Sequence, residues 1–334
     1  SYQDVDRTLF TDDELRQIDE TYAEKCEAFQ TVTNLTDAKN LVREFDALVA
    51  QLEKAHKNSD FQKENSIQGA LNCLPDDVRD FTQGFAERFR YLYEAYLKDA
   101  GSRVYLSLIP DKNYFMAAPN GYPSIDYEQF AEELQSRTGY MQYIDIFDLL
   151  ELEDYYRTDA HWRQEKILDV AARLAGGMGV ELTGSYTRKT LEKPFYGVYY
   201  GQAALPIAPE EMNYLTGGAI DTAAVYNYET DTEGGIYDAE KAAGRDPYEM
   251  FLSGSVSLLR IENPQNTSGR RLVIFRDSFG SSIAPLLVEG YSSVTLVDIR
   301  YLASSRLGGF VDFTGCDVLF LYSAGVLNNS STLK

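Results

Sequence analysis

The sequence predicts an α/β fold with a mostly parallel sheet, preceded by a helical region and interrupted by an irregular insertion. Short apolar, β-prone runs of the kind found in buried strands recur between residues 103 and 322. Helical patterns lie between several of these runs, and a helix between two strands is the unit from which parallel sheets are built. We expect a helical N-terminal region over residues 1–75, packed on a main domain over 76–334 with the insertion at about 183–255.

Capping signals and periodicity predict three helices at the N-terminal end. Thr11 and Glu14 form a capping-box pattern, and a second helix is expected to start at Thr36. Polar residues 57–69 indicate a loop, and a third helix is expected over about 76–99, ending before Gly101. The apolar faces of the second and third helices are Leu41, Val42, Phe45, Leu48, Val49 and Leu52, and Phe81, Phe85, Phe89, Leu92, Tyr93 and Tyr96.

From residue 103 onward, strands and helices are expected to alternate. Strands are expected at 103–110 and 140–147, and helices at 126–137 and 162–174. Residues 183–250 are rich in Tyr, Gly, Thr and Asp with weak periodicity, which indicates short strands and long loops. Alternation resumes at 256–261. Central strands are expected at 272–275, 294–299 and 318–322, with a helix at 281–288.

The composition limits the partners that the chain can have. Its 334 residues suffice for one large domain or two smaller ones, and 44% of them are hydrophobic, so a substantial core is possible. The formal net charge of −21 repels phosphate backbones and anionic membranes. We therefore expect no nucleic-acid partner, and an anionic glycan would need a local basic patch.

The cysteines give no sign of a metal site or a disulfide framework. Cys26, Cys73 and Cys316 have no metal-type spacing, although a Cys26–Cys73 bridge stays open, and Cys316 is expected to be a buried thiol. No metal site is expected from one histidine with scattered carboxylates. No apolar run is long enough to span a bilayer. The polar start at Ser1 fits a chain trimmed of an export signal or anchor, and a cytoplasmic protein would look the same.

Ser278 follows a buried-type strand and precedes an expected helix. Such a turn lifts a side chain out of the sheet and directs backbone N–H groups at one point, where they can bind an oxyanion. Gly280 would let the backbone approach closely, and ligands of open α/β sheets bind at the carboxyl ends of the strands. The alternative is that Ser278 only caps the helix.

A serine hydroxyl needs a base to take its proton, and the chain has two histidines. His56 lies at a charged helix end and is expected to be solvated. His161 is the stronger candidate, because Asp159 stands two residues before it and could fix its tautomer by a hydrogen bond. The alternative is a loop histidine satisfied by a local carboxylate. The tyrosine-rich stretch 185–200 either lines a cleft or packs the insertion.

Two runs, in this order, resemble a known family. The run Tyr156-Arg157-Thr158-Asp159-Ala160-His161-Trp162 is similar to the Thr-Asp-His-His-Trp signature of the DHHW protein family, with Ala160 in place of the first histidine. The run Phe275-Arg276-Asp277-Ser278-Phe279-Gly280 resembles its nucleophile block. Segments 108–113, 248–254 and 297–301 resemble its Pro-x-Lys turn, the segment upstream of the serine and a later strand end. The resemblance covers roughly residues 75–325.

Members of that family are SGNH-hydrolase-like and related to the periplasmic O-acetyltransferases of alginate biosynthesis. The resemblance therefore implies a three-layer sandwich around a mostly parallel sheet. It also implies a triad of Asp159, His161 and Ser278. The aspartate and histidine precede the serine here, whereas SGNH hydrolases place them after it, so a rearranged strand order around the site is expected.

For the oxyanion-binding and substrate-binding roles, the resemblance gives three candidate residues. Gly280, Arg276 and Arg300 are the residues we expect in these roles. Arg276 stands where SGNH enzymes often have glycine, two residues before the serine. Arg300 could bind a carboxylate or an acyl oxygen, or could instead pair with Asp298.

We therefore expect an exported bacterial O-acetyltransferase or acetylesterase that acts on a cell-surface or dietary carbohydrate and needs no cofactor. Its expected partners are a carbohydrate or acetylated polysaccharide and an acyl-donor membrane protein, at an extracellular or cell-envelope location. One alternative is an inactive glycan-binding or envelope-assembly protein, indicated by Ala160, the acidic charge and the tyrosine-rich insertion. Another is a scaffold that docks partners through its N-terminal helices.

Overall fold

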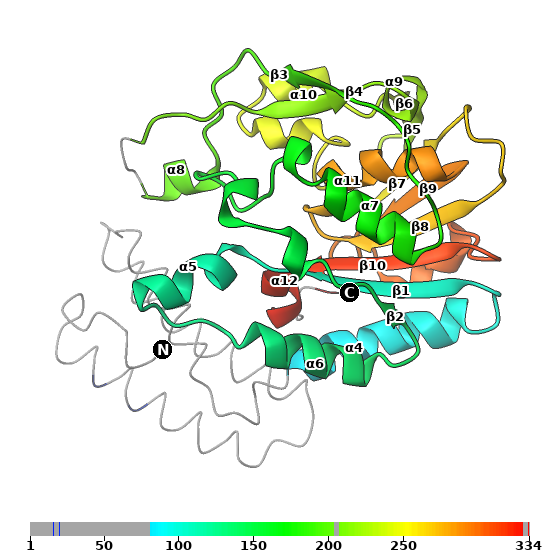
Figure 1. Ribbon diagram of the computed structural model, residues 1–334. Coiled ribbons are helices and arrows are strands. Elements are labelled where there is room, and N and C mark those ends of the chain that lie inside the picture. Colours follow the sequence, from blue (N-terminus) through cyan, green and yellow to red (C-terminus); the bar gives the residue numbers. More distant parts are fainter. Residues whose placement is uncertain (1–15, 17–19, 21–80, 204–206, 330–332, 334) are drawn as a thin grey trace. The chain divides into compact units, whose positions relative to one another are not determined.

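A computed structural model gives the arrangement of the chain (Figure 1). The structure describes residues 16, 20, 81–203, 207–329 and 333. The chain divides into two compact units, Ser1–Gly84 and Phe85–Lys334. The elements expected within residues 1–75, among them the capping pattern at Thr11, the helix start at Thr36 and the Cys26–Cys73 pair, lie outside the described residues.

An eight-stranded sheet in the order β2-β1-β10-β8-β9-β7-β5-β6 forms the centre of the second unit. The five neighbouring strands β2, β1, β10, β8 and β9 pair in parallel. Beyond β9, the strands β7, β5 and β6 continue the sheet in antiparallel pairing. The expected mostly parallel sheet is therefore confirmed. The strands are β1 Arg103–Ile109, β2 Gln142–Tyr143, β5 Ala224–Asn227, β6 Thr232–Gly234, β7 Leu258–Glu262, β8 Arg271–Arg276, β9 Ser293–Val297 and β10 Asp317–Ser323.

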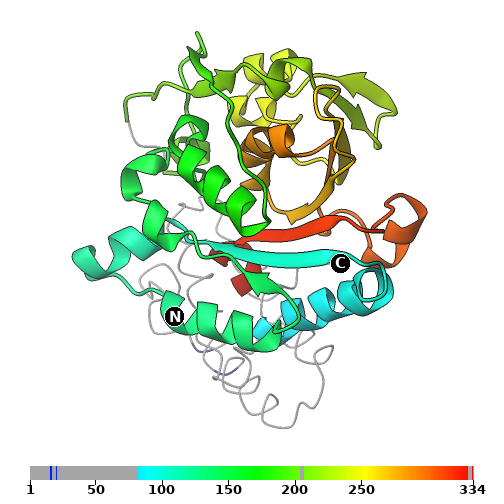
Figure 2. The same ribbon diagram turned by 45° about the vertical axis from the view of Figure 1, so that its right-hand side comes forward.

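Alternate residues of the central strands serve two different cores. Along β10, Leu319 and Leu321 pack in the core that contains α7 (Leu168–Gly177) and α11 (Gly280–Leu287). Phe320 and Tyr322 pack in the core that contains α4 (Phe81–Leu92) and α6 (Tyr127–Arg137). Successive side chains of a strand point to opposite faces, so a continuous apolar run supplies both layers. The result is a three-layer sandwich (Figures 1 and 2).

The insertion contributes β5 and β6 to the central sheet, where β5 pairs with β7. It also forms a separate two-stranded sheet of β3 (Thr187–Thr190) and β4 (Asn213–Thr216). Short elements joined by loops are what the weak periodicity of this region predicted. Its helical elements are α8 Val198–Ala203, α9 Ala219–Thr222, α10 Ala239–Ala243 and a 3-10 turn at Pro247–Met250.

Several helices differ from the sequence expectation at their ends. The helix expected over 162–174 is a 3-10 turn at Gln164–Lys166 followed by α7, so His161 lies in the loop before it. The strand expected over 140–147 shortens to β2. The helix expected to extend to about residue 99 consists, in the described residues, of α4 followed by a π-helical turn at Tyr93–Leu97. Two further helices, α5 (Lys112–Asn120) and α12 (Ala324–Asn328), follow the carboxyl ends of β1 and β10.

In the part of the chain that the structure describes, no helix combines the length and the apolar character that crossing a bilayer requires.

The remaining 3-10 turns are Phe147–Leu149, Leu152–Asp154, Val288–Gly290 and Ser304–Gly309. Cys316 is a buried free thiol, as expected.

Removing the Phe320 ring is expected to destabilise the protein strongly. This buried ring lies 4.5 Å from that of Phe275 and 4.7 Å from that of Phe89, measured between ring centroids. A Phe→Ala change at such a site costs about 3–5 kcal/mol of unfolding free energy, which chemical denaturation of Phe320→Ala should show. Phe310→Ala is the control, because its ring is 51% exposed, and it should stay within about 0.5 kcal/mol of wild type. Equal losses would contradict this core.

Candidate active site

Ser278 lies in the turn between β8 and α11, at the carboxyl end of the strand. The buried Asp277 beside it holds this turn, because one carboxylate oxygen accepts the N–H of Phe279 at 3.0 Å. The other oxygen accepts the N–H of Ser323, at the end of β10, at 2.7 Å. Asp277 therefore fastens the turn to the neighbouring strand, while Ser278 itself stays partly exposed.

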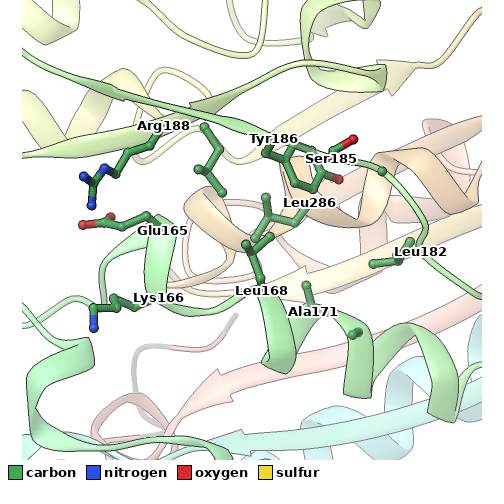
Figure 3. A pocket seen from close by; sticks show the side chains of 12 residues that line it. Glu165, Lys166, Leu168, Ala171, Leu182, Ser185, Tyr186, Arg188 and Leu286 are labelled. Carbon is green, nitrogen blue, oxygen red and sulfur yellow. The ribbon is translucent and has the colours of Figure 1, made fainter.

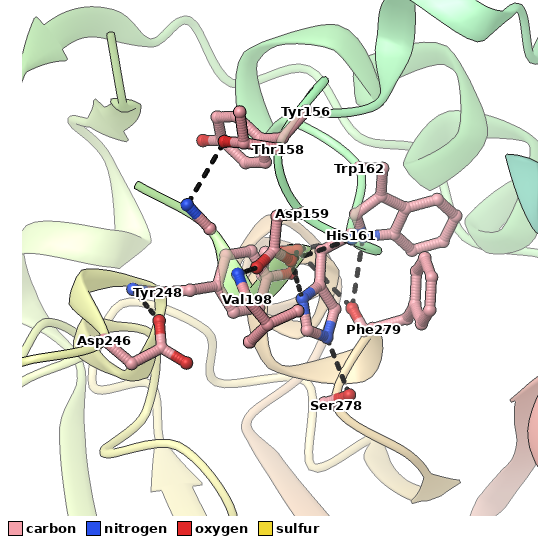
Figure 4. Close-up of polar contacts among 12 residues, drawn as sticks. Tyr156, Thr158, Asp159, His161, Trp162, Val198, Asp246, Tyr248, Ser278 and Phe279 are labelled. Carbon is pink, nitrogen blue, oxygen red and sulfur yellow. Dashed lines mark hydrogen bonds and ion pairs between the residues drawn. The ribbon is translucent and has the colours of Figure 1, made fainter. Parts of the chain in front are cut away.

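The side chains of Ser278, His161 and Asp159 form a hydrogen-bonded chain (Figure 4). His161 Nε2 lies 2.7 Å from Ser278 Oγ, and His161 Nδ1 lies 2.6 Å from Asp159 Oδ1. An ionised carboxylate can only accept, so Nδ1 carries the ring proton and Nε2 accepts from the serine hydroxyl. The serine hydroxyl thus faces a base, and no side-chain cap is recorded at the start of α11, which leaves the helix-cap alternative unsupported.

The Asp159 carboxylate is held in its ionised form. Burial alone would raise its pKa, but the hydrogen bonds from the His161 ring and from the backbone N–H groups of Val198 and His161, together with the electrostatic attraction of the ring, outweigh burial, and the pKa is lowered. The backbone N–H of His161 also donates to Oδ1, at 3.0 Å, and the N–H of Val198 donates to Oδ2, at 3.0 Å. Asp159 can therefore fix the tautomer and the orientation of the ring.

Glu210 of the insertion holds the loop that leads to Asp159. Its carboxylate accepts the N–H groups of Arg157 and Thr158, at 2.8 and 2.7 Å, and the hydroxyl of Thr158, at 2.7 Å. The guanidinium of Arg163 completes the set at 2.6 Å. Burial raises the pKa of Glu210, but these donors outweigh burial, and the pKa is lowered. On another side of the loop, Lys112 donates to the carbonyls of Tyr156 and Arg157.

The insertion touches this loop so closely that only glycine fits at residue 197. A Cβ on Gly197 would lie 2.3 Å from the carbonyl oxygen of Thr158 and 2.4 Å from Cβ of Asp159. The N–H of Gly197 donates to the Thr158 hydroxyl at 3.1 Å, and the N–H of Tyr199 donates to the Thr158 carbonyl at 3.0 Å. This close approach places the N–H of Val198 against the Asp159 carboxylate.

Tyr248 and Ser282 connect the imidazole to the helix that follows Ser278. The Tyr248 ring stacks on His161 with centroids 4.0 Å apart and an interplanar angle of 12°. Its hydroxyl donates to Ser282 Oγ at 2.8 Å, and Trp162 Nε1 donates to the same atom at 2.9 Å. Ser282 therefore joins the insertion, the histidine loop and α11 at one buried point.

The three candidate oxyanion and substrate-binding residues lie in different settings. Arg276 is fully buried, donates to the carbonyl of Val256 at 3.0 Å and lies 3.7 Å from Asp298. This burial contradicts a direct contact between Arg276 and substrate, because the surrounding side chains exclude ligand as well as water. Arg300 pairs with Asp298 through two hydrogen bonds of 2.9 and 2.7 Å, which is the pairing alternative. Gly280 is buried, and a Cβ there would lie 2.6 Å from Cβ of Arg276.

The backbone of the serine turn offers one N–H group for an oxyanion. The N–H of Phe279 donates to the Asp277 carboxylate, and that of Gly280 donates to the Asp277 carbonyl at 3.0 Å. Within the described residues, no acceptor is recorded for the N–H of Ser278 itself. This group is therefore the donor that remains open beside the hydroxyl, near the start of a helix whose dipole favours negative charge.

Sequence reasoning missed the residues that hold the site in place. Glu210, Val198 and Tyr248 all lie in the region of weak periodicity. Tyr248 falls in the segment 248–254 that resembles the family and Val198 in the tyrosine-rich stretch, but no local pattern shows which groups these residues hold. Asp277 could have been found, because it stands beside the serine in a buried run. In the described part of the chain, no group of three or more His, Cys, Asp or Glu side chains is arranged to hold a metal ion.

A separate hollow of about 650 Å³ lies beside α7 (Figure 3). None of Asp159, His161 and Ser278 lines it, so it is distinct from the site above. Its lining is apolar along one side and charged at one end. The apolar side chains include Leu168, Leu182 and Leu286, and the charged ones are Glu165, Lys166 and Arg188.

Comparison with solved structures shows which fold this chain shares. A DHHW family protein from Eubacterium siraeum matches with a TM-score of 0.60 and 19% identity, over 76% of this chain and 87% of that one. Bacillus cereus PatB1 with a sulfonyl adduct matches with a TM-score of 0.56 and 19% identity, over 74% and 88% of the two chains. The O-acetyltransferase domain of Pseudomonas putida AlgJ is more distant, with a TM-score of 0.47 and 12% identity over 76% and 86%.

The resemblance to the DHHW family is thus confirmed at the level of the fold, which is the mixed α/β sandwich described above. No family model matches the sequence, and no curated protein matches it significantly.

Replacing Glu210 by glutamine is expected to destabilise the protein in a pH-dependent way. The amide presents an NH₂ group to donors that need an acceptor, which costs about 1–3 kcal/mol. The folded-state pKa is lowered, so the stabilising effect is complete above the ordinary glutamate pKa of about 4.3 and is lost as pH falls through the folded value. In urea denaturation, the difference between wild type and Glu210→Gln should therefore shrink in acid.

Glu211→Gln is the matched control, because Glu211 is the exposed neighbour of Glu210. This substitution is expected to leave the stability unchanged. The fluorescence of Trp162, the one tryptophan in the sequence, should report the displaced loop in Glu210→Gln only. A Glu210→Gln protein as stable as wild type at neutral pH would mean that this carboxylate does not hold the loop.

Proposed function

We propose that this protein transfers an acyl group, most simply acetyl, from a donor to Ser278 and then to a carbohydrate hydroxyl or to water. The observation that carries the proposal is the unbroken chain of hydrogen bonds from Ser278 Oγ through His161 to Asp159. A hydroxyl bonded to a base that a carboxylate orients is the arrangement that acyl transfer requires.

The proposed reaction uses these groups in two steps. Ser278 Oγ attacks the acyl carbon while His161 Nε2 takes the hydroxyl proton. The oxyanion accepts a hydrogen bond from the N–H of Ser278, and His161 gives its proton to the leaving oxygen, which leaves an acyl-serine. The acceptor hydroxyl or water then attacks the acyl carbon. Its proton passes to His161 and then to Ser278 Oγ as the ester bond to the serine breaks.

A solved structure of the same fold supports the presence of a nucleophilic side chain. PatB1, which has the same fold, has been solved with a sulfonyl adduct. Sulfonyl groups become attached to proteins when a nucleophilic side chain attacks a sulfonyl reagent. A hydroxyl that has a base beside it, as Ser278 has, is such a nucleophile.

A rim of exposed tyrosines supports a carbohydrate substrate. Tyr196 and Tyr199 are 42% and 40% exposed, and they flank Val198, whose N–H binds Asp159. A tyrosine ring offers an apolar face and a polar hydroxyl, which suits a sugar with its apolar ring face and polar edges. This part of the tyrosine-rich stretch therefore faces outward beside the site. Because the sequence resembles the DHHW family, we also propose an exported, cell-envelope setting and an acyl-donor membrane protein as partner.

The second candidate is an inactive glycan-binding protein on the same fold. Ala160, in place of a signature histidine, and the tyrosine rim favour it. The two candidates differ in the reactivity of Ser278. A fluorophosphonate should label the active enzyme at Ser278 and should leave an inactive protein unlabelled.

Ser278→Ala is expected to abolish turnover of a chromogenic acetyl ester such as p-nitrophenyl acetate. Loss of the nucleophile should cost about 10⁴–10⁶ in rate. Ser281→Ala is the control, because it removes a neighbouring buried hydroxyl that has no hydrogen-bond partner in the described structure. Equal rates for wild type and Ser278→Ala would dispose of the proposed activity.

Asp159→Asn is expected to keep the fold and to lower the rate of ester turnover by about 10⁴, because the amide favours the wrong tautomer of His161. Because the pKa of Asp159 is lowered, its carboxylate stays ionised at neutral pH and should not limit the rate there. Asp169→Asn, at an exposed residue in the first turn of α7, is the control. A rate within a few-fold of wild type for Asp159→Asn would show that the carboxylate does not orient the base.

A further inference from the structure

A second carboxylate, that of Asp246, lies at the same site and is not used by the Ser278–His161–Asp159 chain. Asp246 immediately precedes the 3-10 turn Pro247–Met250 and is two residues before Tyr248, the ring that stacks on His161. Figure 4 draws it on the far side of Val198 from the imidazole, with one carboxylate oxygen directed in this view toward the side where Ser278 lies. The turn that carries Tyr248 thus carries an acid to the edge of the site.

The Asp246 carboxylate is fixed through one oxygen only. Oδ1 accepts the N–H of Tyr248 at 3.0 Å, which sets the side-chain conformation. For Oδ2, no hydrogen bond is found in the described part of the chain. The side chain is half-buried, so the free oxygen is neither enclosed nor fully solvated. An acceptor held in place in this way is suited to a donor from a ligand.

The electrostatic surroundings agree with this placement. Burial raises the pKa of Asp246 and the negative charge of Asp159 raises it further, whereas the hydrogen bond from the N–H of Tyr248 and the electrostatic attraction of His161 lower it. Asp246 is therefore within electrostatic reach of both residues. The neighbouring acid Glu249 is paired with Lys241 at 2.9 Å and does not compete for the same ligand.

We propose that Asp246 selects the acceptor, by accepting through Oδ2 a hydrogen bond from a second hydroxyl of the sugar whose first hydroxyl attacks the acyl-serine. This inference rests on the proposed function and names the part of the site that would recognise the acceptor. A hydroxyl group in this place satisfies the free oxygen, whereas a carboxylate or phosphate there is repelled by it. The residue then acts in the second step and leaves formation of the acyl-serine unchanged.

Asp246→Asn separates this role from support of the turn. The amide oxygen of asparagine still accepts the N–H of Tyr248, so the turn is kept while the charge is lost. The matched control is Asp312→Asn. Asp312 accepts the N–H of Thr314 through Oδ1 at 3.0 Å, in the same kind of turn. Asp312 precedes β10, so it lies near the amino ends of the parallel strands, whereas Ser278 lies at their carboxyl ends.

The experiment measures the two steps separately. Acyl-serine formation is followed by fluorophosphonate labelling and by the burst of nitrophenol from p-nitrophenyl acetate. Transfer is followed by mass spectrometry with the methyl glycosides of glucose, mannose and N-acetylglucosamine, and with methanol, which has only one hydroxyl. Asp246→Asn should raise KM for the accepted glycoside by about 10–100-fold. It should change labelling, the burst and methanol transfer by less than about twofold, and Asp312→Asn should change nothing.

Two results would overturn the inference: an unchanged KM for the glycosides, or an equal loss with methanol and with the glycosides. Binding of the same glycosides to Ser278→Ala, with and without Asp246→Asn, keeps the inference independent of turnover. If wild type neither labels nor shows a burst, the proposed acyl transfer fails. A tenfold weaker binding on adding Asp246→Asn would then still identify Asp246 as the sugar-binding group, and unchanged binding would reject it.

Discussion

The close contact of the insertion backbone with the loop at Thr158 and Asp159 is the constraint on which the rest of the site depends. Glycine at residue 197 lets the two backbones approach, and three successive N–H groups, from residues 197 to 199, then bind the hydroxyl of Thr158, the carboxylate of Asp159 and the carbonyl of Thr158. Without this contact the Asp159 carboxylate would keep only its bonds to His161. The insertion is therefore part of the site, not an addition to it.

Buried charged side chains hold the serine turn in place. Asp277 binds two backbone N–H groups, one in its own turn and one on β10, and Asp298 is shared by Arg276 and Arg300. Burying charges costs free energy that hydrogen bonds and pairing only offset, so such groups are weak evidence for stability. Their effect here is positional: they leave Ser278 one arrangement relative to its base, which is the preorganisation that acyl transfer needs.

The parts of the site come from three regions of the chain. The sheet supplies Ser278, the loop before α7 supplies Asp159 and His161, and the insertion supplies Glu210, Tyr248 and the exposed tyrosines. In the proposed reaction, the first two regions perform the chemistry and the third selects the acceptor. Changes at Asp246 or at the exposed tyrosines could then alter which sugar is recognised, whereas changes at residues 197–199 or at Glu210 would also displace the loop that carries Asp159 and His161.

The sequence by itself predicted the central strands and the three side chains that the fold joins by hydrogen bonds. β8 and β10 could be predicted because a strand buried on both faces must be apolar throughout, and Asp159 could be paired with His161 because two residues of spacing bring them within reach. The tertiary structure alone decided the rest. Arg276 could be read as a substrate ligand until the fold enclosed it, and Glu210 and Tyr248 stand about 50 and 90 positions from the groups they hold. Contacts of that kind depend on how separate segments pack, and no local periodicity encodes them.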